Sequence, residues 1–117
     1  MISSINSSIS ALKAFEKKMG VTANNVANVE SEEFKKSRAV MTEGARKEVR
    51  VEIEKIETSG PIVSEIEDGK VVEKELSNVD LVEEIPQTII AQRNFEANLK
   101  SIQAQEETLN SFLDIIG

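Results

Sequence analysis

The sequence predicts a mainly α fold with a small β insert between an N-terminal and a C-terminal helix. Apolar residues recur at helical spacing at both ends of the chain, and they alternate with polar residues in the middle. The 117 residues suffice for one ordinary domain. We expect residues 1–34 and 77–117 to form one discontinuous helical core domain, and residues 35–76 to form the β-rich insert.

The first segment has the apolar spacing of a coiled-coil helix. Serines fill its other faces, and serine is a mediocre helix former, so this helix should need a partner. The expected packing stripe consists of Ile2, Ile5, Ile9, Leu12, Phe15 and Met19.

The stretch VTANNVANVE, residues 21–30, follows this helix with three asparagines, although asparagine is poor in a helix interior. Two interpretations fit Asn24, Asn25 and Asn28. They form local caps and turns at a frayed helix end, or they bond to backbone groups and neighbouring subunits where the helix ends. Residue chemistry alone favours the first.

The middle of the chain has the period of β structure. In EVRVEIEKIE, Val49, Val51 and Ile53 face one side and charged residues the other, as in a half-buried strand. TSGP reads as a turn, and Asp68-Gly69 is a common hairpin turn pair. We expect a three-stranded meander over Lys47–Leu76.

The last segment predicts a longer and stronger helix. Asp80 and Glu83 form a helix-start pair. Pro86 either kinks this helix or marks the first turn of a helix that begins at Ile85. Its stripe consists of Ile85, Ile89, Phe95, Leu99, Ile102, Leu109, Leu113 and Ile116.

Neither stripe has a local cover, so we expect the terminal helices to pair as an antiparallel coiled-coil-like hairpin. Two helices cannot hide such wide stripes on each other completely. The remaining apolar surface would then contact other subunits.

The composition of the chain argues against two classes of function, nucleic-acid binding and catalysis. A net charge of −7 argues against nucleic-acid binding, and the sequence contains neither cysteine nor histidine, which disfavours catalysis. The adjacent pairs Glu83-Glu84 and Glu106-Glu107 would not converge on one ligand. We therefore expect no enzyme activity, cofactor, metal or small-molecule ligand.

The start MISSINSSIS lacks the basic and apolar regions of a secretory signal, and no apolar run is long enough to span a bilayer. We expect no membrane insertion. The protein should be cytoplasmic unless it leaves the cell by a route that cleaves nothing.

Two motifs carry a family resemblance. ANNVANVESEEFKKSR (residues 23–38) and SNVDLVEEIPQTIIAQRNFEANLKSI (residues 77–102) resemble the N-terminal and C-terminal signatures of bacterial flagellar rod and hook proteins. The matching residues are Asn24, Asn25, Asn28, Phe34, Lys35, Ser77, Asn78, Val79, Asp80, Gln92, Arg93, Glu96 and Asn98. Glu33 departs from the pattern, because the family usually has glycine before the aromatic residue.

The resemblance implies an axial subunit of the flagellum, whose terminal helices form an inner coiled-coil tube and whose middle forms outer β structure. It reverses the preference for Asn24, Asn25 and Asn28, which it implies bond to backbone groups and neighbouring subunits where a helix of the tube leads into the outer insert. It also implies export by the flagellar type III apparatus with an uncleaved signal, and partners that are copies of the chain and other rod or hook subunits. The short insert suggests a proximal rod subunit located in the basal body. Hook or hook-junction proteins remain alternatives, as does a soluble helical adaptor that binds an amphipathic helix. Arg93 would pair with an acidic group across subunits or lie on a solvated helix face.

Overall fold

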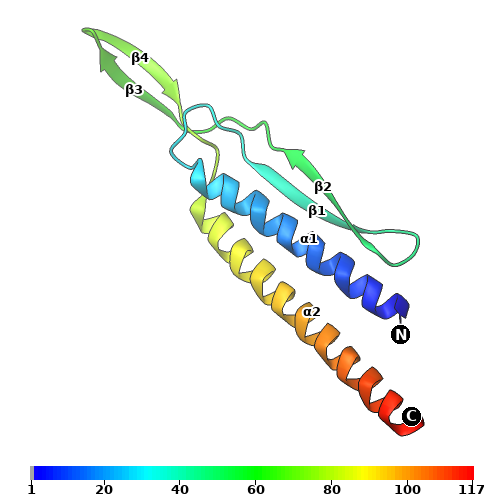
Figure 1. The fold of residues 1–117 in the computed structure, drawn as a ribbon. Coiled ribbons are helices and arrows are strands. Elements are labelled where there is room, and N and C mark those ends of the chain that lie inside the picture. The colour runs from blue at the N-terminus through cyan, green and yellow to red at the C-terminus, as the bar shows by residue number, and fades with distance from the viewer. Residues whose placement is uncertain (1) are drawn as a thin grey trace.

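The computed structural model describes residues 2–117, with side chains from residue 4 onward, so the predicted Ile2 side chain lies outside the described residues. Helix α1 (Ile2–Ala27) and helix α2 (Leu81–Ile116) lie side by side and run in opposite directions (Figure 1). The molecule is elongated, with extents of 82 × 25 × 18 Å. Its shape follows from α2, since 36 helical residues span about 54 Å.

Four strands in two antiparallel pairs lie between the helices. Strand β1 (Ser37–Glu43) pairs with β2 (Val49–Lys55), and β3 (Ile62–Glu67) pairs with β4 (Lys70–Glu75). The predicted three-stranded meander is therefore wrong. Its strands form, but β2 pairs with β1, a strand that the sequence pattern does not predict, instead of with β3.

The β1–β2 hairpin covers the side of α1 that faces away from α2 (Figure 1). Met41 lies opposite Val51 in the register, and both are half-buried. The backbone N–H of Val49 donates a hydrogen bond of 3.0 Å to Ser10 Oγ, which ties the start of β2 to α1. The predicted apolar face of β2 is thus the face that packs on the helix, although Ile53 at its far end is 51% exposed.

The β3–β4 hairpin projects beyond the paired ends of the helices (Figure 1). Asp68 and Gly69 both have positive φ angles, 51° and 76°, as a two-residue turn of type I′ requires. The predicted hairpin turn is confirmed. Ile66 and Val71, which lie opposite each other in the register, are both largely exposed.

Helix α2 begins at Leu81 with Asp80 as its N-cap, since the Asp80 side chain accepts a hydrogen bond of 2.9 Å from the N–H of Val82. The predicted helix start is confirmed, and the alternative start at Ile85 is wrong. The helix continues through Pro86, whose ring removes only one of the helix's hydrogen-bond donors.

The contact between the helices is built from small side chains. The buried apolar residues of the described chain are Ala11, Ala14 and Ala91. The predicted stripes are only half-buried or exposed: on α1, Ile9 is 38% exposed, and on α2, Ile85 is 52% exposed. Small side chains let two helices approach closely, but they leave the larger apolar residues beside the contact rather than inside it.

Among the described helices, none combines the length and the apolar character that crossing a bilayer would require.

Candidate functional site

The end of α1 and the start of α2 meet in one region, which we call the joint (residues 25–38 and 75–84). Two backbone hydrogen bonds connect its segments: Glu33 N–H donates to the Glu75 carbonyl at 3.0 Å, and Asn78 N–H donates to the Phe34 carbonyl at 3.2 Å. The two motifs that lie far apart in the sequence therefore adjoin each other in space.

Asn25 holds three elements together. Its side chain is 1% exposed. Its amide donates to the Ser37 carbonyl at 2.7 Å and to Glu84 Oε2 at 3.2 Å, and its Oδ1 accepts from Ser37 N–H at 3.0 Å. The side chain thus pairs with the first residue of β1 as another peptide group would, while it also bonds to α2.

Asn78 does the same on the other side of the joint. Its Oδ1 accepts from Lys36 N–H at 2.6 Å, and its amide donates to the carbonyls of Ile56 at 2.8 Å and Thr58 at 2.9 Å. These bonds fix the chain just before β1 and just after β2. Asn78 therefore sets the direction in which both strands of the first hairpin leave the joint.

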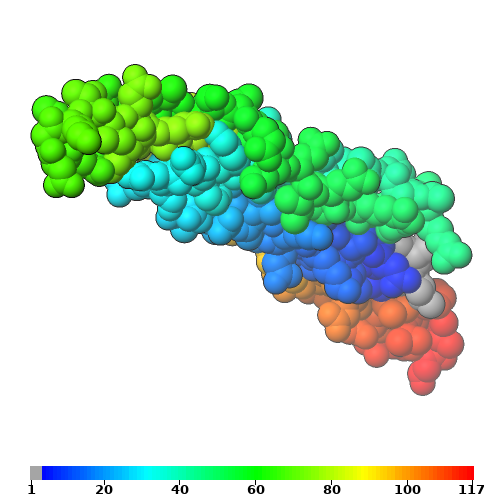
Figure 2. Space-filling view, turned by 90° about the horizontal axis from the view of Figure 1, so that it is seen from above, coloured from blue at the N-terminus to red at the C-terminus, as the bar shows by residue number. Residues whose placement is uncertain are grey.

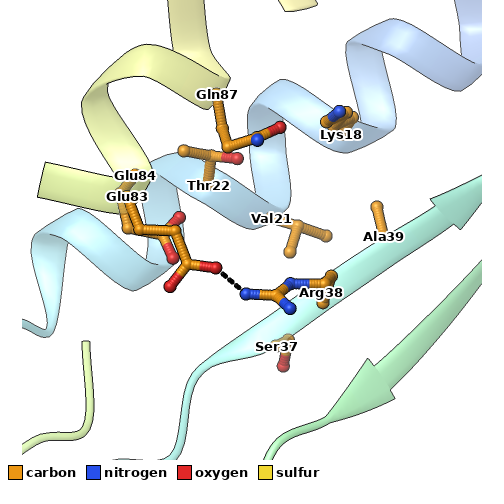
Figure 3. A pocket seen from close by; sticks show the side chains of 9 residues that line it. All are labelled: Lys18, Val21, Thr22, Ser37, Arg38, Ala39, Glu83, Glu84 and Gln87. Carbon is orange, nitrogen blue, oxygen red and sulfur yellow. Dashed lines mark hydrogen bonds and ion pairs between the residues drawn. The ribbon is translucent and has the colours of Figure 1, made fainter. Parts of the chain in front are cut away.

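Ion pairs reinforce these bonds. Lys36 Nζ lies 2.7 Å from Glu83 Oε2, and Arg38 forms a second ion pair with the same carboxylate (Figure 3). Glu83 lies in the first turn of α2, where the helix dipole also favours a negative charge. One acidic residue of α2 therefore pairs with Lys36, just before β1, and with Arg38, the second residue of β1.

A further ion pair joins Lys35 to Glu75, and Gly60 N–H donates to Glu75 Oε1 at 3.0 Å. The Lys35 ammonium, followed by the Gly60 N–H, holds the pKa of Glu75 below its ordinary value. The carboxylate form of Glu75 is thus the form that the joint favours.

A cavity of about 250 Å³ opens beside these contacts. Figure 3 shows that α1, β1 and α2 all contribute to it; the lining residues are Lys18, Val21, Thr22, Ser37, Arg38, Ala39, Glu83, Glu84 and Gln87. Glu84 is buried and bonded to Asn25, and Glu83 is bonded to its two basic partners. Both carboxylates fasten the fold, and no group of three or more metal-ligating side chains occurs within residues 2–117.

Glu33 adopts a φ of 58°. This is the left-handed region, which costs a residue with a side chain roughly 1–2 kcal/mol and costs glycine nothing comparable. The departure from the family pattern therefore lies at a position where the backbone does require a positive φ.

The other asparagines of the first motif act locally. The Asn28 amide donates to the Asn24 carbonyl at 2.9 Å, and Ser31 Oγ donates to Asn28 Oδ1 at 3.0 Å. Asn24 itself is exposed. Within one chain the helix end thus shows local capping by Asn28 and bonding to a distant backbone group by Asn25, whereas bonding of these asparagines to neighbouring subunits stays a prediction.

The residues of the second motif lie partly at the joint and partly away from it. Asp80 caps α2, and buried Ser77 accepts a hydrogen bond of 3.1 Å from the N–H of Val79. Gln92 and Arg93, by contrast, are exposed on α2, away from the joint. Within the described residues Arg93 forms no ion pair, and its pairing across subunits stays a prediction.

Sequence reasoning missed several residues of the joint: Lys36, Ser37, Arg38, Glu83 and Glu84. A signal was present, because the basic run KKSR in the first motif and the acidic pair in the second have opposite charges. Such complementarity indicates contact only when the two segments are already known to lie together.

Comparison with known proteins matches the same two segments. The family model of flagella basal body rod proteins matches residues 5–35, and that of the C-terminal part of flagellar basal body rod FlgEFG proteins matches residues 74–115. The flagellar hook proteins FlgE of Escherichia coli K12 and Salmonella typhimurium are each 42% identical over 41 residues. That match covers 35% of this chain but only 10% of the hook proteins.

The fold and the joint define a chain whose paired end helices carry a β insert. The two family models together span well over half of the chain, in the expected order and at the expected ends. The chain therefore belongs to the flagellar rod and hook family of axial proteins.

Proposed function

We propose that the protein is a structural subunit of the bacterial flagellar basal-body rod, which self-assembles helically through its terminal helices. The observation that carries this proposal is the combination of a joint built from both family motifs with apolar stripes that the single chain leaves half-exposed. Leu99 is 41% exposed and Leu113 54% exposed, and neighbouring subunits would cover such surfaces.

The short insert favours a rod subunit over a hook subunit. In this chain, only residues 36–73 separate the two segments that match the family models. The hook protein is much longer, because the part of it that matches this chain is only a tenth of its length. We infer that residues 1–34 and 77–117 act as one helical assembly unit, with residues 35–76 on the outside.

We also infer that the protein is exported through the flagellar type III apparatus without cleavage of a signal. We infer that its terminal helices become more ordered when it assembles with other subunits. Among the described residues the fully buried apolar side chains are alanines, so burial within the single chain contributes less free energy than a core of large apolar side chains would. Burial of the stripes against neighbouring subunits would add to the stability of the folded form by mass action.

The test is to tag the protein in its native cell, purify detergent-washed hook–basal bodies and probe them for the tag. We expect the protein to be present and motility to fail when the gene is deleted. A protein that stays in the cytosol, with swimming intact after deletion, would exclude the rod and favour the helical adaptor.

Substitutions in the α2 stripe refine this test. Leu99→Asp or Ile102→Asp places a charge on the packing face, and we expect either variant to be lost from the basal bodies. Ser101→Asp is the matched control, because Ser101 is exposed on the same stretch of helix. Normal incorporation of both stripe variants would refute assembly through this face.

A further inference from the structure

The β3–β4 hairpin (residues 62–75), which we call the arm, leaves the rest of the molecule from a narrow root. Among the described elements, neither β3 nor β4 packs against a helix or against the first hairpin. Figure 2 shows the arm (light green) at one end of the molecule, with the segment that follows α1 (cyan) beside its root. Few contacts therefore fix the direction in which the arm points.

Backbone hydrogen bonds close the root. The N–H of Leu76 donates to the Pro61 carbonyl at 2.7 Å, and the N–H of Glu33 donates to the Glu75 carbonyl at 3.0 Å. The ion pair of Lys35 with Glu75 lies at the same place. The contacts of Glu33 and Lys35 with the arm thus end on a single residue, and attachment at one residue does not fix the tilt of the arm.

Lys74 provides a second attachment. Its Nζ lies 3.6 Å from Glu32 Oε1, in the segment that follows α1. The same Nζ lies 3.1 Å from Glu65 Oε2 and 2.6 Å from Glu67 Oε1, both on β3. An ammonium group has three donors, so one lysine accommodates all three carboxylates. Lys74 therefore connects both strands of the arm to the segment after α1.

This cluster of side chains depends on the charge of Lys74. Glu67 and Glu65, followed by Glu32, raise the pKa of Lys74, so its ammonium form persists at neutral pH. Without the ammonium, Glu32 would face the two carboxylates of β3 across the space between the arm and the segment after α1, and like charges repel. Lys74 thus converts a repulsive contact into an attractive one.

We propose that the Lys74–Glu32 ion pair fixes the tilt of the arm, and that the arm swings about its root when high ionic strength breaks this pair. The device belongs to the single chain and operates whether or not copies assemble. Side chains alternate along a strand, so Ile62, Ile66 and Val71, all largely exposed, lie on the face of the arm opposite Lys74. The tilt therefore decides where the arm presents its apolar face.

Salt acts first on the pair with Glu32. This pair is the longest of the three contacts of Lys74, and the Glu32 side chain is 56% exposed against 22% for Lys74. The Debye length falls from about 10 Å at 0.1 M to about 3 Å at 1 M salt, so the pair loses much of its attraction over this range. A partly exposed ion pair of this kind shifts an equilibrium roughly two- to fivefold.

Distances between two spin labels measure the tilt, and the chain contains no cysteine that would interfere. One label is attached at Glu16→Cys on α1 and the other at Ser64→Cys on β3, both exposed positions. The distance distribution is measured by double electron–electron resonance. Raising the salt from about 0.1 to 1 M should increase the population outside the main distance peak roughly two- to fivefold. A distribution that does not change with salt would overturn the proposal.

Glu32→Gln and Lys74→Gln are the test variants in this labelled chain. Glu32→Gln removes only the link between the arm and the segment after α1, so it should broaden the distribution at low salt and abolish the salt response. Lys74→Gln also leaves Glu32 to repel the carboxylates of β3, so its distribution should shift further. Lys74→Arg retains the positive charge and should keep the distribution of the unsubstituted chain.

Glu30→Gln and Lys70→Gln are the matched controls, since each removes the same charge from the same segment as its test variant. Both residues are exposed, and neither forms an ion pair within the described part of the chain. Neither control should change the distribution. A change as large as that of the corresponding test variant would refute the specific role of the Lys74–Glu32 pair.

Nuclear magnetic resonance separates a change of tilt from unfolding of the arm. Ser64 and Glu73 lie opposite each other in the register, and the nuclear Overhauser effects between their backbones should persist in Glu32→Gln. Loss of these signals would mean that the ion pair keeps the arm folded instead of setting its tilt, and the proposal would fail.

Discussion

Asn25→Ala should loosen the joint more than any other single asparagine change in the first motif. The substitution removes both hydrogen bonds with the Ser37 peptide group and the bond to Glu84. Each neutral bond contributes about 0.5–1.5 kcal/mol and a bond to a charged group about 1.5–3 kcal/mol, which gives roughly 2.5–6 kcal/mol in total. Alanine returns about 0.5 kcal/mol through its better helix propensity, and partial relaxation favours the lower half of the range.

We therefore expect Asn25→Ala to lower the free energy of unfolding by about 3 kcal/mol. The measurement is urea unfolding followed by far-UV circular dichroism, in which the midpoint should fall while the slope stays constant. Asn24→Ala is the matched control, because Asn24 is an exposed neighbour on the same helix and gains the same propensity. If the two variants unfold within about 0.5 kcal/mol of each other, the reasoning about the joint is refuted.

Three further predictions concern the backbone and the ion pairs of the chain. Glu33→Gly should raise the free energy of unfolding by about 1 kcal/mol, because φ is 58° there; a fall in urea unfolding would contradict this. Gly60→Ala should destabilise the folded chain severely, since an added Cβ would lie 2.0 Å from the backbone carbonyl oxygen of Leu76. Gly20→Ala is the contrast, because Gly20 has open space around it, and this change should stabilise α1 by about 1 kcal/mol. Glu75 has a lowered pKa, so its stabilising effect is present above the pKa of the unfolded chain and is lost as the pH falls through the folded value. The unfolding free energy should therefore decrease below about pH 4.3, and Glu75→Gln should flatten that decrease; an unchanged pH profile would refute the role of the pair with Lys35.

Local patterns were sufficient for much of the fold. The helical spacing placed both helices, Asp80 marked the start of α2, the alternation in β2 identified its packing face, and Asp68-Gly69 fixed the second hairpin. Each of these features depends on residues within a few positions of one another. A single sequence therefore contains the information to predict them.

Strand pairing was not predictable in this way. Strand β1 has the sequence SRAVMTE, whose apolar residues do not alternate with polar ones, and it forms because β2 lies beside it on α1. The choice of β1 over β3 as the partner of β2 depends on where the joint directs the chain. Register and pairing are non-local properties, and the sequence pattern permits more than one arrangement.

The joint shows most clearly what each level decides. The sequence by itself determined that the asparagines near residue 25 mark the end of a helix and that two signature motifs lie near the ends of the chain. Only the tertiary structure decided that Asn25 bonds to Glu84, fifty-nine positions further on, and that the apolar stripes lie beside the helix contact instead of within it. The physical reason is that helix propensity acts within a few residues, whereas burial and hydrogen bonding depend on which distant surfaces the folded chain brings together.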